Sequence, residues 1–419
     1  RTKSASDWKT MMIFGEGRGS GPSYLWSSSQ HCDSGFSSSA TYNASYPHYC
    51  GYYAFDITGS TCTAASSSCT PPSPVFKWRL GGAAGIPAAY GPYLTEPWSK
   101  FSIGKILIND NEKWVGFVGG GGSTDNSKGN GMFAVDLNDG SILWGFTHAD
   151  NAAMDYGLVA MPYLYDADND GFIDTAYVGD RRGNVWRFKF CRKSDGTSCS
   201  TSNWTGGMLL DASGSGITPI FTEVAVATDS QKNLWVFFGT GDKNDPTGTS
   251  APQDKAVALK DNDRTTTYTY GNLENITSSG STYSGTGDGY YINMTGAGEK
   301  ILAYPVIWDF MWYFTSYTPP SGTDPCAQGG TAKLYVVKAF TGAGDVPTTG
   351  DRSISIGTGI ATSPLISLNP GTPGTPMTAS LVVGISGGGG SGGSLTTPVT
   401  PPAPPTRNQM IYWRDRRVQ

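Results

Sequence analysis

The 419-residue sequence has little charge and no long apolar run. Only 15% of its residues are charged, the formal net charge is −5, and Lys and Arg form no long run, so we expect no nucleic-acid partner. No stretch of about 18 apolar residues is present, which argues against a membrane-spanning segment. The N-terminal RTKSASDWKT lacks the apolar core of a signal peptide, and we expect a soluble chain or a processed piece of a longer one.

Histidine is also scarce, and cysteine occurs in no CxxC pair. With only His31, His48 and His148 available, a catalytic metal site built from several histidines is not expected. The local spacing of the seven cysteines, across Ser- and Thr-rich loops, favours disulfides over zinc sites and leaves Cys326 over. The expected pairs are Cys62 with Cys69, Cys191 with Cys199, and Cys32 with Cys50.

Glycine, proline and large aromatic residues are abundant instead. The chain holds 57 Gly, 26 Pro, 22 Tyr and 12 Trp, a composition that suits many short strands and tight turns and suits helices poorly. Its length is sufficient to bury a core as one large domain or as two ordinary ones. We therefore predict an all-β protein.

A pattern of apolar run, glycines, polar loop and second apolar run recurs along the chain. The copies include WKTMMIFGEGRGS with GYYAFDIT, KWVGFVGGGG with GMFAVDLNDGSILWGF, DTAYVGDRRGNVWRFKF, NLWVFFGTGD with KAVALKDND, and MWYFTSYTP with KLYVVKAFTG. Alternation over residues 132–137 predicts a strand with one buried face, and NDG at 138–140 predicts a hairpin turn. Repeated antiparallel sheets expose their edges unless they close into a ring, so we predict a β-propeller, with a pair of β-sandwiches as the alternative.

The composition changes near the end of the chain. Residues 391–406 form a Gly- and Pro-rich linker after a predicted propeller domain over residues 1–390. Residues 407–419 contain the short apolar run MIYW, which we expect to return as a strand that closes the propeller; the alternative is a loose tail.

The strongest motif is DADNDGFID at residues 166–174. Numbered from Asp166, it has carboxylates at positions 1, 3, 5 and 9, a glycine at 6, and a residue at 7 that can offer its main-chain carbonyl. These are the positions from which a calcium loop surrounds a hard cation with oxygen atoms. The expected ligands are Asp166, Asp168, Asp170, Phe172 through its carbonyl, and Asp174.

The motif is not an EF-hand. Position 12, where an EF-hand has a bidentate Glu, is Tyr177, and a strand-like segment follows in place of a helix. Four carboxylates this close repel one another without a cation, which favours calcium over a solvated acidic turn. Magnesium fits less well because it requires strict octahedral geometry.

With these repeats and this loop, the chain resembles the C-terminal β-propeller of the type IV pilus tip adhesins and biogenesis factors of the PilC/PilY family. The order of the repeats, the calcium loop and the closing YWRD carry the resemblance over nearly the whole chain. It implies a modified seven-bladed, quinoprotein-like propeller. The family's calcium ligands correspond to the five residues named above.

The resemblance also implies a function. We expect an exported, calcium-binding, non-enzymatic domain at the pilus tip on the bacterial surface. It would support pilus biogenesis, attachment and twitching motility through control of extension and retraction, with pilins, minor pilins and a host or abiotic surface receptor as partners. The alternative is a quinone-dependent dehydrogenase, but the repeats that suggest it are scaffold and carry no chemistry. Trp78, Trp144 and Trp186 lie in repeat positions and are expected to pack between blades.

Overall fold

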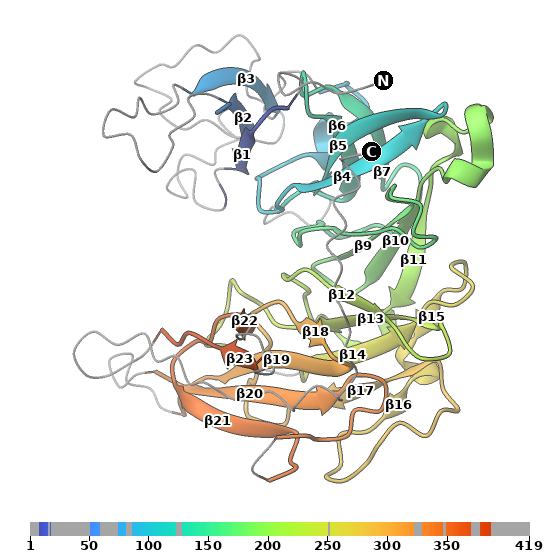
Figure 1. Ribbon diagram of the computed structural model, residues 1–419. Coiled ribbons are helices and arrows are strands. Elements are labelled where there is room, and N and C mark those ends of the chain that lie inside the picture. The colour runs from blue at the N-terminus through green and yellow to red at the C-terminus, as the bar shows by residue number, and fades with distance from the viewer. Residues whose placement is uncertain are drawn as a thin grey trace, which may run out of the picture.

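The computed structural model describes residues 8–15, 17, 51–58, 74–80, 86–122, 128–249, 252–321, 329–346, 349–369 and 378–386. These residues form strands and short 3-10 helices, with no α-helix among them, which confirms the predicted all-β class (Figure 1). The 3-10 helices are η3 (Gly91–Tyr93), η4 (Lys193–Ser198), η5 (Thr201–Asn203), η6 (Ser213–Ser215) and η7 (Tyr270–Asn272). No helix in this described part of the chain has the length and apolar character needed to cross a bilayer.

The described strands form six sheets that follow one another along the chain. The first contains β1 (Met11–Gly15), β2 (Tyr52–Asp56) and β3 (Val75–Leu80), and the second contains β4 (Ser102–Ile108), β5 (Asn111–Gly119), β6 (Gly131–Asp136) and β7 (Ile142–Thr147). The third contains, in spatial order, β15 (Tyr268–Thr269), β11 (Thr205–Asp211), β10 (Val185–Lys189), β9 (Thr175–Gly179) and β8 (Tyr163–Tyr165).

The remaining three sheets come from the second half of the chain. The fourth contains, in spatial order, β12 (Ala225–Thr228), β13 (Leu234–Gly239), β14 (Lys255–Lys260), β17 (Gly289–Asn293) and β16 (Glu274–Asn275). The fifth contains β18 (Val306–Trp308), β19 (Met311–Thr318), β20 (Thr331–Lys338) and β21 (Ser353–Thr358), and the sixth contains β22 (Leu365–Asn369) and β23 (Thr378–Val382).

The sheets are arranged as the blades of a β-propeller. The first strands of consecutive sheets contact one another, β4 with β8, β8 with β12, and β12 with β18. Each repeat expected from the sequence contains an antiparallel pair of neighbouring strands: β1–β2, β5–β6, β9–β10, β13–β14 and β19–β20. The described residues contain six sheets, and the count of seven blades stays a prediction. The predicted linker at 391–406 and closing strand at 407–419 lie outside the described residues.

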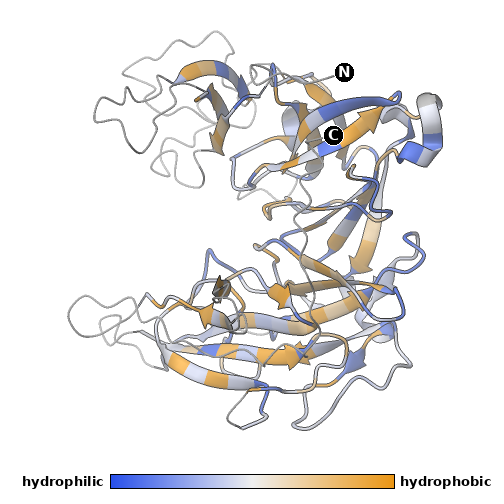
Figure 2. Ribbon diagram, in the orientation of Figure 1, coloured by the Kyte–Doolittle hydropathy of each residue, from blue (hydrophilic) through white to orange (hydrophobic). Residues whose placement is uncertain are grey.

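The sequence predicts that the strand over residues 132–137 buries one face, but β6 is buried on both faces. All six residues of this strand are buried, because blades pack against both of its faces. Met132 and Ala134 belong to a core cluster shared with β9 and β10, whereas Phe133 and Val135 belong to one shared with β2 and β3. Figure 2 shows the contrasting case of β21, a sheet-edge strand where isoleucines alternate with serines.

One turn and one disulfide match the sequence expectations. Gly140 in the NDG turn has a φ of 76°, a conformation that glycine adopts without steric cost, and the chain enters β7 two residues later. Cys191 and Cys199 form a disulfide, as the spacing predicts. The other cysteine pairs and Cys326 lie outside the described residues. Trp78 and Trp186 are buried and Trp144 is partly buried, which confirms their packing role.

One connection exchanges strands between sheets. After β14 the chain runs through residues 261–275, here called the crossover segment. Its β15 adds to the third sheet, parallel to β11, and its β16 then returns to the fourth sheet, parallel to β17. At its start, buried Asp261 accepts hydrogen bonds from Arg187 Nη1 at 2.5 Å and from Tyr177 Oη at 2.7 Å. The third and fourth sheets are therefore linked by strands and by a buried ion pair.

Candidate metal centre

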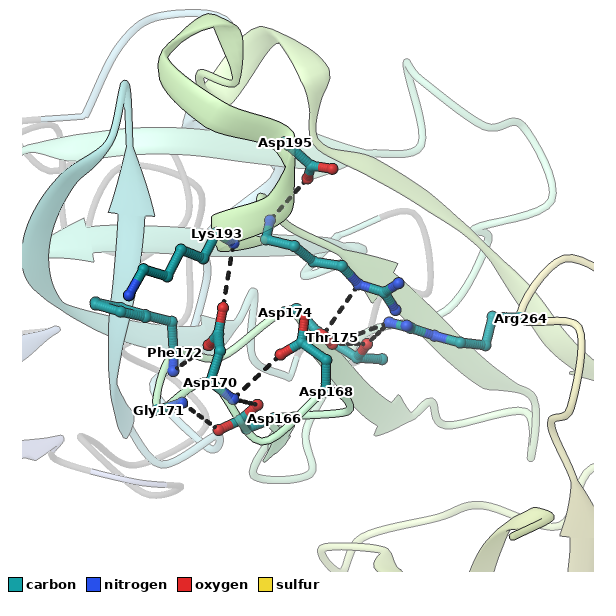
Figure 3. A network of polar contacts seen from close by, with 11 residues as sticks. Asp166, Asp168, Asp170, Gly171, Phe172, Asp174, Thr175, Lys193, Asp195 and Arg264 are labelled. Atoms are coloured by element: carbon teal, nitrogen blue, oxygen red, sulfur yellow. Dashed lines mark hydrogen bonds and ion pairs between the residues drawn. The ribbon is translucent and has the colours of Figure 1, made fainter.

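The acidic loop connects β8 to β9, the last two strands in the spatial order of the third sheet, and Figure 3 shows its aspartates. These strands are antiparallel, with Tyr165 opposite Thr175, so the loop is the tip of a hairpin. Ile173 N donates to Lys105 O at 2.8 Å, which joins the loop to β4 of the preceding sheet. The expected position of the motif on a β-hairpin is confirmed.

The loop is folded by its own carboxylates. Asp166 accepts hydrogen bonds from Asp170 N at 3.1 Å and Gly171 N at 2.8 Å, and Asp168 accepts one from Asp170 N at 3.2 Å. Asn169 and Gly171 have φ values of 59° and 90°, left-handed conformations that Asn and Gly tolerate best. The sequence DNDG therefore produces the sharp turn on which the carboxylates converge.

The turn brings three of the four aspartates together. One carboxylate oxygen each from Asp166, Asp168 and Asp174 lies within 4.8 Å of the other two. Asp170 lies outside this cluster, because its carboxylate accepts hydrogen bonds from Phe172 N at 2.8 Å and Lys193 N at 3.2 Å. The fifth expected ligand, Phe172, lies at the same tip, with its ring 4.3 Å from Lys105 Nζ.

Asp174 has a different environment from the other three aspartates. Its side chain is buried, with 2% exposed. Thr175 Oγ1 donates to Asp174 Oδ1 at 2.6 Å, Arg264 Nη2 lies 3.0 Å from the same oxygen, and Arg192 Nε lies 3.1 Å from Oδ2. Burial raises the pKa of Asp174 in spite of these hydrogen bonds and charges, and burial likewise raises the pKa of Asp166.

This donor set fits a hard divalent cation. All of its candidate ligand atoms are oxygens, and the clustered groups are carboxylates held at the tip of a tight turn. Calcium binds six to eight such oxygens at about 2.3–2.6 Å and tolerates irregular geometry. The five expected residues could supply most of these oxygens, and water molecules can supply the rest.

The arginine partners were not found from the sequence. Arg192 is 18 residues from Asp174 and Arg264 is 90 residues from it, and Arg264 reaches the loop only because the crossover segment enters the third sheet. No motif in the sequence connects these positions. Arg192 approaches Asp174 within the third sheet, because β9 and β10 pair with Thr175 opposite Lys189. Finding Arg264 requires a three-dimensional contact between neighbouring sheets.

Comparisons with known proteins agree with this architecture. Residues 98–245, which include the acidic loop, match the family model of the PilY1 beta-propeller domain. The type IV pilus biogenesis factor PilY1 of Pseudomonas aeruginosa is 31% identical over 148 residues, 31% of this chain and 13% of that protein. A PilY1 homolog of Xylella fastidiosa is 24% identical over 310 residues, 61% of this chain and 20% of that protein.

A solved structure extends the match in fold. The crystal structure of the Pseudomonas aeruginosa PilY1 C-terminal domain aligns with a TM-score of 0.56 and 18% identity, over 79% of this chain and 76% of that one. The matches to the two full-length relatives span only a small part of their length. Over residues 98–245 the chain therefore resembles the PilY1 beta-propeller domain, and over most of its length its fold is similar to that of the PilY1 C-terminal domain.

Proposed function

We propose that this chain is a calcium-binding module of a type IV pilus biogenesis factor. Two of its relatives carry that description, and the acidic loop lies within the segment that matches the family. The observation that supports calcium binding most directly is the convergence of Asp166, Asp168 and Asp174 within 4.8 Å. Two of these carboxylates also hold the turn, but their closeness in one cluster is what a hard cation requires.

The proposed ligands act on the hairpin that carries them. A bound calcium ion supplies two positive charges that offset the repulsion among the carboxylates. Asp166 and Asp168 hold the turn through main-chain hydrogen bonds, and Asp174 directly precedes β9. Residues at both ends of the loop would then be fixed together, so the ion would stiffen the link between β8 and β9.

The proposed setting is the bacterial surface. The domain would be exported through the periplasm and outer membrane and presented at the pilus tip. There it would support attachment and twitching motility and affect the balance of pilus extension and retraction. Its partners would be pilins or minor pilins and a receptor on a host or abiotic surface. The role is binding and regulation, not catalysis, because the quinoprotein-like features of the sequence are scaffold repeats.

A substitution of Asp168 tests the calcium proposal most cleanly. Asp168 is exposed and belongs to the carboxylate cluster, whereas Asp174 is buried between arginines and Asp166 holds two main-chain N–H groups. Asp168→Asn keeps a hydrogen-bond acceptor for Asp170 N but removes one negative charge. We expect isothermal titration to give a Kd of about 10⁻⁶–10⁻³ M for the native chain and binding weaker by about tenfold or more for the variant.

Asp139→Asn provides a matched control. Asp139 is an exposed aspartate in the β6–β7 turn that accepts a hydrogen bond from the main-chain N–H two residues later, as Asp168 does. This variant should bind calcium like the native chain. Absence of calcium binding in the native chain, or equal binding in Asp168→Asn, would contradict the proposal. In cells, Asp168→Asn at normal protein level should change piliation and surface attachment, and Asp139→Asn should not.

A further inference from the structure

Asp174 belongs to two charged groups at once. One of its oxygens lies within 4.8 Å of the Asp166 and Asp168 carboxylates, and both of its oxygens also accept from cationic side chains. Arg192 approaches Oδ2, whereas Arg264 and Thr175 approach Oδ1. A carboxylate has about four lone-pair sites, so these three donors leave little room for a cation.

The two arginines are held in place by different parts of the fold. Arg192 follows Cys191 of the disulfide, and its main-chain N–H donates to Asp195 Oδ2 at 2.7 Å. Arg264 comes from the crossover segment and also donates to Thr175 Oγ1. Its side chain is largely buried, and its Nε has no hydrogen-bond partner among the described residues. Asp174 and Thr175 are therefore the groups that hold the Arg264 guanidinium (Figure 3).

The charges of the site argue for competition. Two guanidinium groups offset part of the negative charge of the four aspartates, and both lie within 3.1 Å of a proposed ligand. A divalent cation at the loop would be repelled by these groups and would compete with them for the Asp174 oxygens. Arginine side chains keep their charge at all physiological pH values, so the competition does not depend on pH in that range.

We propose that Arg192 and Arg264 are the partners of Asp174 in the calcium-free chain, and that they lower the calcium affinity by competing with the ion for this carboxylate. This inference rests on the proposed calcium site and concerns its regulation. Because Arg264 belongs to the crossover segment, calcium binding and the attachment of that segment to the third sheet oppose each other. Calcium binding would thereby weaken one of the contacts that hold the crossover segment, which leads on to β16 of the fourth sheet.

Arginines that only positioned Asp174 for the ion would give the opposite result. In that case their removal would weaken calcium binding, because a buried carboxylate would lose its orientation. Competition predicts tighter binding when either arginine is removed. The direction of the affinity change therefore separates the two roles.

The experiment measures calcium affinity and thermal stability for Arg264→Gln, Arg192→Gln and Arg264→Lys. Each Gln variant should bind calcium about three to ten times more tightly than the native chain. Arg264→Lys should remain near native affinity because it keeps the charge. In a calcium chelator, Arg264→Gln should melt about 2–4 °C lower, because Asp174 loses a buried partner, and excess calcium should restore more stability to it than to the native chain.

Lys193→Gln is the control for general charge. It removes a positive charge from an exposed side chain next to Arg192. Lys193 contacts Asp170 through its main-chain N–H and not through its ammonium group, so the substitution keeps this hydrogen bond. It should change calcium affinity less than twofold, which is about the size of a screened surface effect. Unchanged or weaker binding in both Gln variants overturns the inference while the calcium site stands. No calcium binding by the native chain overturns both proposals.

Discussion

At the level of single residues, two aspartates hold hairpin turns in the same way. Asp180 lies between β9 and β10 and Asp229 lies between β12 and β13. Each accepts hydrogen bonds from main-chain N–H groups of its turn, from the side-chain amide of an Asn four residues later, and from the indole N–H of a Trp six residues later. Asp180 is fully buried, whereas Asp229 is half-buried.

Burial should decide how much each aspartate stabilises the fold. Asp180→Ala leaves the buried donors of Asn184 and Trp186 without partners, and we expect it to lower the free energy of unfolding by about 3 kcal/mol or more. Asp229→Ala allows water to replace the carboxylate, and we expect a loss of about 1 kcal/mol. Urea unfolding of the two variants measures the difference. Equal losses would show that hydration does not reach the Asp229 turn.

Residue chemistry alone predicted the acidic cluster and the buried tryptophans. The spacing of Asp166, Asp168 and Asp174 was informative, because β8 and β9 pair with Tyr165 opposite Thr175 and the turn between them brings the three carboxylates together. The same spacing predicted that Asp170 joins this cluster. In the structure the Asp170 carboxylate instead accepts hydrogen bonds from Phe172 N and Lys193 N. Lys193 lies in η4, beyond the far end of β10, so local spacing could not reveal this contact.

At the level of elements, a single side chain fastens β16 to the loop that precedes β17. Glu274 on β16 accepts hydrogen bonds from Ser284 N at 2.7 Å, Gly287 N at 3.0 Å and Thr286 N at 3.1 Å, and from the hydroxyl groups of Ser284 and Thr286. Burial opposes ionisation of Glu274, but these hydrogen bonds outweigh it and lower its pKa to about 2. The charged form thus holds the loop.

This arrangement predicts a pH dependence. The folded-state pKa of Glu274 lies below its ordinary value of 4.5, so its stabilisation is complete above pH 4.5 and is lost as the pH falls towards 2. The stability difference between the native chain and Glu274→Gln should therefore shrink over that interval. Chemical unfolding at several pH values measures it. Glu112→Gln, at an exposed glutamate of β5, is the control. A stability difference between the native chain and Glu274→Gln that stays constant with pH would contradict the prediction.

Sequence periodicity predicted the central strands of the sheets but not their edges. Long apolar runs such as β13 and β19 carry a clear signal because packing on both faces requires it. The strands β15 and β16 have two residues each and pair in parallel with sheets that precede and follow them in the chain. Such strands have no alternation to detect. Their pairing depends on the neighbouring sheets.

At the level of the whole molecule, the described row of sheets has its smallest sheets at its two ends. The sixth sheet contains only β22 and β23 among the described residues, and Leu365 and Leu368 of β22 are 62% and 42% exposed. In the first sheet, Phe14 and Phe76 are also exposed. Exposed apolar residues on small sheets suggest that further chain covers them. This supports the proposal that residues 407–419 return as a closing strand.

Removal of that segment tests ring closure. A chain that ends at residue 406 should unfold at a temperature several degrees lower and aggregate more readily, because an exposed edge strand pairs with other chains. Trp413→Asp in the full-length chain should have a similar but smaller effect, since it places a charge in the apolar run. Differential scanning calorimetry and light scattering measure both. A truncated chain with unchanged stability would show that the segment is a loose tail.

The crossover segment also limits how blades of this propeller can be gained or lost during evolution. A propeller in which each blade is one continuous stretch of chain can gain or lose a blade by duplication or deletion. Here, deletion of residues 225–293 would remove the whole fourth sheet and also β15 from the third sheet, the Asp261 partner of Arg187, and Arg264 beside the acidic hairpin. The third and fourth blades therefore form one heritable unit, and a graft of the acidic hairpin into another propeller would have to carry both.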